Sequence, residues 1–246
     1  MAQSSWRAAD LPWIILAGGL ATRMRPHTER LPKILLPVAG EPFAAHQLRW
    51  LASEGVRRVV VATGYLGNLI QQFIGDGQAF GLSVSYSSDG PRPLGTGGAT
   101  RQAVEKYSAR GPVGVLYGDS YLTVDLDDVV ARYSTSGLPA LMVVFENRNE
   151  HDASNATFDG RLVHYEKASR NLVGDALRFI DYGVSVFDAA VLLDRLPAGQ
   201  TYDLSNLQAA LSREEQLAGY EATTRFFEIG SPVGLADLEQ HLTGGR

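Results

Sequence analysis

The sequence has 246 residues, no cysteine and a formal net charge of −5 at pH 7. Its length allows a substantial core, and its acidic balance argues against a nucleic acid as the main partner. The lack of cysteine excludes disulfides, thiolate metal sites and a cysteine nucleophile. No stretch reaches the ~18 apolar residues of a membrane helix, and the N-terminus has no secretory pattern, so we expect a cytoplasmic protein.

Strands and helices are predicted to alternate through the first part of the chain. Residues 12–19 are continuously apolar, which is typical of a strand buried on both faces of a parallel sheet. A cationic loop follows, and then a helix over 41–55 with Pro42 in its first turn and Gly55 at its end. Further strands are expected at 56–64, 82–88, 112–120 and 139–146, and helices at 68–77, 97–107 and 126–133. This alternation predicts an α/β fold with a mainly parallel sheet.

The pattern changes from Ser154 onwards. Residues 154–167 predict a β-hairpin that turns at Asp159-Gly160, residues 177–187 a further strand, and residues 234–242 a closing helix. No linker, internal repeat or low-complexity segment divides the chain. We therefore predict one domain whose C-terminal half builds a second subsite.

The segment LAGGLATRMRPHTERLPK, residues 16–33, joins two glycines to several cations. Gly18 and Gly19 lack Cβ atoms, so backbone N–H groups can approach a ligand at the strand end where α/β folds bind ligands. Arg23 and Lys33 are suited to neutralise a polyphosphate. The segment is neither a Walker A loop nor a GxGxxG turn. A bare double glycine would indicate only a turn, but the apolar strand before it and the cations after it favour a phosphate loop.

Other segments carry candidate side chains, each of which is also compatible with a turn, a cap or a surface charge. Asp119 follows a strand at the same sheet edge, where a carboxylate suits Mg²⁺. Residues 94–101, LGTGGATR, lead into a helix whose first N–H groups are expected to be available to an anion. Glu228 ends a short apolar strand. Lys167 and Asp181 lie in the C-terminal half.

In this order, these segments resemble the sugar-1-phosphate nucleotidylyltransferases, and most of all their heptose and mannose 1-phosphate guanylyltransferase branch. The family's opening signature, L-A-G-G-x-G-T-R followed by a proline, a Pro-Lys pair and PV, corresponds to LAGGLATRMRP…LPKILLPV. Ala21 stands where glycine is usual, which restricts the φ angle of that turn. LGTGGA, YGDS and EIGSP match later motifs in the right order, so the resemblance spans residues 11–243.

The resemblance implies a Rossmann-like three-layer α/β/α sandwich with a mainly parallel mixed sheet and a small β-rich sugar-binding part. Within a single domain, residues 1–246, the nucleotide half would cover about 11–150 and the sugar-phosphate half about 151–246. The implied reaction is attack by a sugar 1-phosphate on the α-phosphorus of an NTP, with Mg²⁺-pyrophosphate leaving. No segment resembles the extra C-terminal domain of longer relatives, so transferase activity alone is expected, with a preference for GTP and heptose or mannose 1-phosphate.

The resemblance also assigns roles to individual residues. Arg23 would contact the triphosphate and stabilise the transition state, and Lys33 would bind phosphate between the substrates. Asp119 and Glu228 would hold Mg²⁺, although many relatives have aspartate at the second position. The nucleotide-binding set is Leu16, Ala17, Gly18, Gly19, Gly95 and Thr96. The acceptor-binding set is Asn155, Lys167, Asp181 and Gly183, in which aspartate replaces the usual asparagine at 181 and Ala168 replaces the proline after the lysine.

Two other functions stay open. A cytidylyltransferase acting on phosphocholine would have aromatic and acidic residues around its acceptor, and Tyr165, Tyr182 and Asp181 are compatible with this. A non-catalytic nucleotide-sensing subunit usually loses the arginine, lysine or aspartate of the site, which this sequence retains. The expected partners are an NTP and a sugar 1-phosphate, with no nucleic acid and no membrane. The base, the sugar and assembly into a homo-oligomer stay open.

Overall fold

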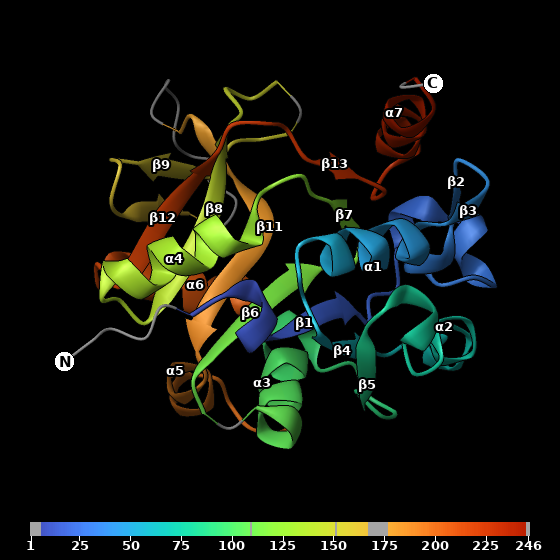
Figure 1. Ribbon diagram of the computed structural model, residues 1–246, viewed down its shortest axis with the longest axis horizontal. Helices are drawn as coiled ribbons and strands as arrows, with labels where there is room; N and C mark the ends of the chain where they lie inside the picture. Colours follow the sequence, from blue (N-terminus) through green and yellow to red (C-terminus); the bar gives the residue numbers. More distant parts are fainter. Residues whose placement is uncertain (1–5, 109, 151, 167–176, 245–246) are drawn as a thin grey trace.

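The computed structural model describes residues 6–108, 110–150, 152–166 and 177–244, and a nine-stranded mixed sheet runs through it (Figure 1). The strands of this sheet are β1 (Pro12–Ala17), β4 (Arg58–Thr63), β5 (Ser83–Ser88), β6 (Pro112–Tyr117), β8 (Ala140–Glu146), β9 (Ala156–Phe158), β10 (Val163–Tyr165), β11 (Phe179–Asp188) and β12 (Leu217–Ala222). Two short pairs lie outside it, β2 (Pro37–Val38) with β3 (Glu41–Pro42) and β7 (Ser120–Tyr121) with β13 (Phe227–Glu228).

The α-helices follow the predicted alternation in the first part of the chain and close its end. They are α1 (Phe43–Ser53), α2 (Gly67–Ile74), α3 (Gly95–Tyr107), α4 (Leu126–Ser136), α5 (Ala189–Arg195), α6 (Leu204–Arg213) and α7 (Pro232–Thr243). Short 3-10 turns occur at Ala8–Asp10, Thr22–Met24, His27–Glu29, Lys33–Leu35 and Gln78–Phe80. Within the described ranges, no helix is both long and apolar enough to cross a membrane.

The order of the strands places a topological switch at β1. The chain passes from β1 to β4 and β5 on one side and then crosses to β6 on the other side, and these four strands are parallel. β11 is antiparallel to β6 and β8, whereas β12 is parallel to β8. The predicted mainly parallel mixed sheet is confirmed. A switch of this kind leaves a crevice at the carboxyl ends of the two central strands, where open α/β sheets bind ligands.

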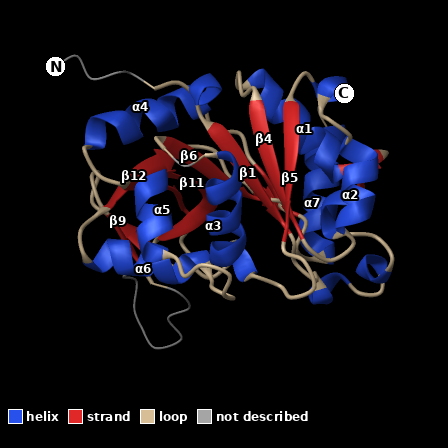
Figure 2. Cartoon of the chain, turned by 90° about the horizontal axis from the view of Figure 1, so that it is seen from below, coloured by secondary structure: helices blue, strands red, loops and turns tan. Residues whose placement is uncertain are grey.

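Helices cover both faces of the sheet because its central strands are apolar on both sides. Trp13 and Ile15 of β1 belong to a core shared with α1, α2 and α4, whereas Ile14 between them belongs to a core shared with α3, α5 and α6. Successive side chains of a strand point to opposite faces, so one strand contributes to both cores. Accordingly, α4 and α6 lie on opposite sides of the sheet (Figure 2). This confirms the expected three-layer arrangement.

The predicted hairpin forms the small β-rich part of the C-terminal half. β9 and β10 pair antiparallel, with Phe158 opposite Val163. In the turn, Gly160 has a φ of 90°. Asp159 Oδ1 accepts hydrogen bonds from Arg161 N at 2.8 Å and from Leu162 N at 2.7 Å. β9 also pairs with the first residue of β11, so the hairpin is joined to the main sheet.

The region between residues 188 and 226 holds three elements that the sequence analysis does not predict. β12 pairs with β8 from Leu217 opposite Ala140 onwards. α6 begins at the capping residue Asp203, whose Oδ1 accepts from Ser205 N at 3.0 Å. α6 packs against the same face of the sheet as α3. Together with α5, these elements complete the second half of the fold.

Candidate active site

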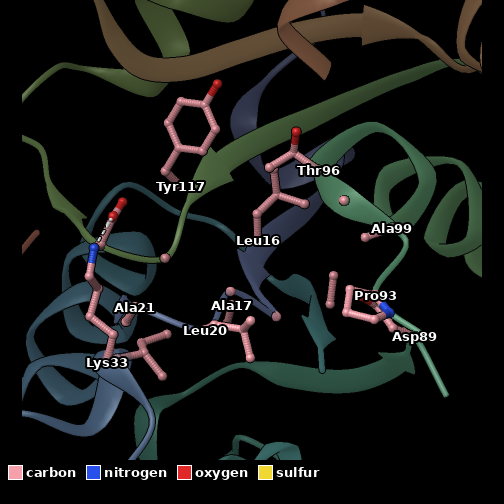
Figure 3. A pocket seen from close by; sticks show the side chains of 17 residues that line it. Leu16, Ala17, Leu20, Ala21, Lys33, Asp89, Pro93, Thr96, Ala99 and Tyr117 are labelled. Carbon is pink, nitrogen blue, oxygen red and sulfur yellow. Dashed lines mark hydrogen bonds and ion pairs between the residues drawn. The ribbon is translucent and has the colours of Figure 1, made fainter. Parts of the chain in front are cut away.

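A cavity of about 260 Å³ opens at the carboxyl ends of β1 and β6 (Figure 3). Its walls come from the loop after β1, the end of β6, the loop before α3 and the first turn of α3. The lining residues are Leu16, Ala17, Gly18, Gly19, Leu20, Ala21, Lys33, Ile34, Ala62, Asp89, Pro93, Gly95, Thr96, Ala99, Tyr117, Gly118 and Asp119. The six residues assigned to the nucleotide therefore share one cavity with Lys33 and Asp119.

The two glycines of the loop after β1 serve different purposes. A Cβ atom at Gly18 would lie 3.2 Å from the backbone N of Gly64 and 3.4 Å from Asp89 Oδ2, so this position allows neighbouring loops to approach closely. A Cβ atom at Gly19 would meet nothing within 4 Å, and this residue is exposed. Gly18 thus permits close packing of the neighbouring loops, whereas Gly19 leaves the backbone beside the cavity open to a ligand.

Ala21 adopts the left-handed conformation that the usual glycine would favour, with φ 46° and ψ 44°. Its carbonyl oxygen accepts hydrogen bonds from Met24 N at 3.0 Å and from Thr28 Oγ1 at 2.9 Å. These bonds hold the turn although a Cβ atom makes this conformation unfavourable. The substitution at Ala21 therefore preserves the shape of the loop at a cost in free energy.

We expect Ala21→Gly to raise the free energy of unfolding by about 0.5–1 kcal/mol, because glycine relieves the left-handed strain but is freer in the unfolded chain. Urea denaturation measures the change. Ala131→Gly is the matched control, since Ala131 is an exposed residue inside α4 where glycine should cost about 1 kcal/mol. Equal losses of stability in both variants would contradict this account of the loop.

Arg23 lies in the 3-10 turn Thr22–Met24 that follows this loop. The turn buries Met24, which is 2% exposed, and directs Arg23 to solvent. Arg23 is not among the residues that line the cavity. Of the two cations assigned to substrate phosphates, the structure thus places Lys33 at the cavity and Arg23 outside its lining.

Lys33 and Asp119 meet at one end of the cavity although they are distant in sequence, and Glu228 lies near Lys33 but is not among the lining residues. Lys33 Nζ and Asp119 Oδ2 form an ion pair at 2.7 Å, with side chains 16% and 33% exposed. The carbonyl oxygen of Asp119 accepts from Ile229 N at 2.9 Å, and Glu228 of β13 lies opposite Ser120 of β7. Backbone pairing therefore brings Glu228 next to the chain segment that carries Asp119.

Gly230 makes room for this group of charges. A Cβ atom at that position would collide with Glu228 Oε2 and would lie 3.3 Å from Lys33 Nζ. The other carboxylate oxygen, Glu228 Oε1, accepts a hydrogen bond from Ser231 Oγ at 3.1 Å. A Cβ atom at Gly230 would therefore displace the Glu228 carboxylate from its present position, and Ser231 orients that carboxylate.

The donor set at this end of the cavity fits Mg²⁺. Mg²⁺ commonly uses one or two protein carboxylates and takes its other ligands from substrate phosphates and water. Asp119 and Glu228 supply two carboxylates, and the ion pair with Lys33 shows that Asp119 already faces a cation. In the part of the chain that the structure describes, no three His, Cys, Asp or Glu side chains gather into a complete metal site. A metal here would depend on the substrate for its remaining ligands.

The first turn of α3 is not open to an anion in the way that its glycines suggest. Gly97 N and Gly98 N both donate to the carbonyl oxygen of Tyr202, at 2.8 and 3.3 Å. A Cβ atom at Gly95 would lie 2.6 Å from the same oxygen. The expectation of available N–H groups is therefore wrong at positions 97 and 98, because a distant segment packs there. Thr96 and Gly95 nevertheless line the cavity.

A second polar group surrounds the beginning of β11, next to Tyr117 of the cavity. Asn155 Oδ1 accepts from Asp181 N at 3.0 Å, and Asp181 Oδ1 accepts from Gly183 N at 2.9 Å. The Tyr117 hydroxyl lies 3.5 Å from Asp181 Oδ2. Three of the four residues assigned to the acceptor thus lie together, and Lys167 lies outside the described residues.

Burial in this polar group raises the pKa values of Asp181 and Tyr117. Burial raises the pKa of Asp181 to about 6, against the opposing hydrogen bonds from Gly183 N and the Tyr117 hydroxyl. Burial and then the negative charge of Asp181 raise the pKa of Tyr117 well above its ordinary value. Tyr117 therefore presents a neutral hydroxyl near neutral pH, and ionisation of Asp181 destabilises the folded state.

We expect the gain in the free energy of unfolding from Asp181→Asn to be larger at pH 8 than at pH 4. Because the pKa of Asp181 is raised in the folded protein, the wild-type protein loses stability as the pH rises through about 6. The increase in this pKa corresponds to roughly 3 kcal/mol in the free energy of unfolding. Asparagine can still accept from Gly183 N and donate to Tyr117. Urea unfolding of both proteins across this pH range measures the difference. Ala131→Gly alters no titratable group, so its effect should be constant; a constant effect for Asp181→Asn would contradict the prediction.

The fold and the site define an α/β protein with its ligand cavity at a topological switch point, and comparisons with known proteins identify its family. The family model described as nucleotidyl transferase matches residues 13–227. The chain therefore belongs to the nucleotidyl transferase family, and the resemblance seen in its motifs is confirmed. It is an enzyme of the transferase class.

Individual relatives agree with this assignment. The chain is 26% identical over 231 residues to a D-glycero-alpha-D-manno-heptose 1-phosphate guanylyltransferase of Aneurinibacillus thermoaerophilus, covering 93% of this chain and 97% of the relative. It is 28% identical over 227 residues to an N-acetylmuramate alpha-1-phosphate uridylyltransferase of Neisseria meningitidis, covering 92% and 96%. The fold matches a putative glucose-1-phosphate thymidylyltransferase from Bacillus anthracis with a TM-score of 0.80 at 20% identity, covering 94% of each chain.

Proposed function

We propose that this enzyme transfers a nucleotidyl group from an NTP to a sugar 1-phosphate and releases pyrophosphate. The observation that carries the proposal is that the glycine loop after β1, Lys33 and Asp119 line one and the same cavity. Guanylyl, uridylyl and thymidylyl relatives differ in base and sugar but share this type of transfer. The range of bases and sugars among these relatives supports nucleotidyl transfer as the type of reaction. The preference for GTP and a heptose or mannose 1-phosphate rests on the sequence motifs.

In the proposed reaction, an oxygen of the sugar phosphate attacks the α-phosphorus of the NTP in line, and pyrophosphate leaves. Lys33 would offset the charge that develops on the phosphoryl oxygens, and Arg23 would reach the triphosphate from the solvent side. Asp119 and Glu228 would hold Mg²⁺, which supplies charge stabilisation to the triphosphate and the leaving group. The protein aligns the two anions and needs to form no covalent intermediate.

The acceptor would bind beside Tyr117, where Asn155, Asp181 and Gly183 lie together, with Lys167 as its proposed phosphate ligand. A phosphocholine acceptor is less well supported, because Tyr182 is fully buried and Tyr165 is 8% exposed. The Tyr182 hydroxyl also accepts from Thr123 N at 3.3 Å. These two rings therefore offer little surface to a quaternary ammonium group.

A matrix of NTPs against sugar 1-phosphates, with phosphocholine included, tests the proposal. Five NTPs are incubated with each acceptor and Mg²⁺, and pyrophosphate is measured. We expect release in at least one combination with a sugar 1-phosphate and loss of release when EDTA is added. Nucleotide binding without turnover across a broad acceptor panel would favour a sensor instead, and release with phosphocholine alone would favour the cytidylyltransferase.

A further inference from the structure

Gln47 is a buried polar residue to which the sequence motifs assign no role. It lies inside α1, where it is 1% exposed. Its Nε2 donates to Tyr117 O at 2.9 Å and to Ser120 O at 3.0 Å. Because both acceptors are carbonyl oxygens, the NH2 group and not Oε1 must face them. One side chain of α1 therefore binds the chain on both sides of Gly118 and Asp119.

The turn between β6 and β7 depends on restraints from outside because it passes through a glycine. A Cβ atom at Gly118 would lie 2.7 Å from Leu16 O, to which Gly118 N donates at 3.0 Å. The lack of a Cβ atom permits this close approach but leaves the backbone next to Asp119 freer to move. Asp119 O accepts from Ile229 N at 2.9 Å. The two bonds from Gln47 thus add to the restraint of the residue that carries the proposed metal carboxylate.

The amide of Gln47 also carries a cost in free energy. Its Oε1 is buried and has no hydrogen-bond partner among the described residues. A buried acceptor without a partner is unfavourable, and an apolar side chain would avoid this cost. An apolar side chain would, however, give no donor to Tyr117 O and Ser120 O. What the amide specifically supplies is therefore a fixed position for the turn.

Gln208 of α6 provides a comparison within the same chain. It is also 1% exposed, and its Oε1 likewise lacks a partner among the described residues. Its Nε2 donates to Ser185 Oγ at 3.2 Å, which is a side chain of β11 and not the backbone beside Asp119. The two glutamines thus match in burial and in chemistry but hold different parts of the fold.

We infer that Gln47 is a positioning residue for the proposed metal site, which holds the turn between β6 and β7 so that the Asp119 carboxylate stays where Mg²⁺ would bind. The inference rests on the proposed function, which assigns Asp119 to the metal. Groups that orient a metal ligand commonly change metal affinity by about 10–100-fold although they do not touch the ion. Gln47 would act through the backbone, since the Asp119 carboxylate itself faces Lys33.

The first test follows the turn itself and needs neither metal nor substrate. Hydrogen exchange at Gly118 N and Ile229 N, the two amides that anchor the turn, is measured by NMR relative to the amides of β1. Gln47→Met keeps an unbranched side chain of similar length but has no N–H to donate, and Gln208→Met is the matched control. We expect exchange at both amides to become about 10-fold faster in Gln47→Met, because two hydrogen bonds are lost nearby. Exchange should stay unchanged in Gln208→Met.

The second test measures the Mg²⁺ requirement with a combination of NTP and acceptor that releases pyrophosphate. The Mg²⁺ concentration that gives half-maximal turnover should rise about 10-fold in Gln47→Met, and excess Mg²⁺ should restore most of the turnover. Gln208→Met should keep the wild-type Mg²⁺ requirement. A general loss of stability would instead lower the turnover of both variants at every Mg²⁺ concentration.

A third measurement needs no variant. In the wild-type protein, the Nε2 hydrogens of Gln47 should exchange about 10-fold or more slowly than those of Gln71, which is exposed, because they are donated to carbonyl oxygens. Equal rates would overturn the inference even if thermal unfolding showed that Gln47→Met does not fold.

Each outcome of the variant tests decides the inference. Faster exchange at the turn together with a higher Mg²⁺ requirement, both confined to Gln47→Met, supports it. An unchanged exchange rate or an unchanged Mg²⁺ requirement overturns it and leaves the proposed transfer reaction standing. Equal effects in the two variants also overturn it, because loss of any buried glutamine would then suffice. Absence of pyrophosphate release by the wild-type protein in every combination would overturn the proposed function, and faster exchange would then assign Gln47 to the shape of the turn alone.

Discussion

Asp119→Asn is expected to lower kcat by about 10²–10³-fold or more, because a metal-bound triphosphate derives several kcal/mol of transition-state stabilisation from the ion. The amide keeps the size of the side chain but loses the charge that faces Lys33 at 2.7 Å and that would hold Mg²⁺ with Glu228. Pyrophosphate release at a Mg²⁺ concentration that just saturates the wild-type enzyme measures the loss. Raising the Mg²⁺ concentration should recover part of the activity, since the remaining carboxylate binds the ion more weakly.

The matched control is Asp127→Asn. Asp127 also pairs with a cation, Arg7, at 2.8 Å, but it lies at the first turn of α4 and not in the cavity lining. An exposed pair of this kind contributes little to stability, so this variant should keep wild-type turnover. Equal activity of the two variants would remove Asp119 from the proposed metal site.

Arg23→Ala is expected to lower turnover by about 10²–10³-fold, by analogy with the loss of one preorganised charge-stabilising donor. This large effect is expected although Arg23 is exposed and lies outside the cavity lining. Its guanidinium group would contact the triphosphate only once the substrate is bound. Single-turnover measurements with saturating NTP distinguish a loss of transition-state stabilisation from a loss of binding.

Arg25→Ala provides the comparison for Arg23→Ala. Arg25 is an exposed arginine two positions further along the same segment, and the motif gives it no assigned role. Both variants should unfold at the wild-type temperature, since exposed side chains are lost in each case. Full activity of Arg23→Ala would remove Arg23 from the proposed site. Equal losses in the two variants would show that general positive charge near the cavity supports turnover and that Arg23 has no specific role.

The parallel strands β1, β4, β5 and β6 could be predicted because each of them carries its own signal. β1 is a continuous apolar run, β4 contains the apolar run 59–62, and each strand is followed by a glycine. Their side chains enter both cores. β12 has no such signal, since its sequence LAGYEA contains glycine and a glutamate. Its strand conformation comes from pairing with β8, a long-range contact that local propensity does not report.

α6 is a different case, because a local signal was present. Asp203 caps its first turn, and Leu204, Leu207 and Leu211 recur at helical spacing. All three leucines are 2% exposed or less. Attention to the cap and this spacing together would have identified the helix.

The site could be predicted where its residues follow strands of known order. Lys33 and Asp119 come from motifs at the carboxyl edge of the sheet, and the structure brings them to one cavity. Asp89 was missed because the segment SSDGPRP reads as a turn. The usable signal was its position directly after β5, at the same edge as Gly18. The partner of the α3 glycines could not be predicted, because residues 200–204 are a hundred positions away.

The pairing of β7 with β13 sets how the proposed metal site is assembled. This ladder has two residue pairs, Tyr121 with Phe227 and Ser120 with Glu228, and it lies outside the main sheet. Asp119 is anchored at the end of β6, whereas Glu228 arrives with the last part of the chain. During synthesis, the residues that line the cavity therefore emerge before Glu228 does. In the finished protein, opening of this short ladder would separate the two carboxylates while the main sheet stays intact.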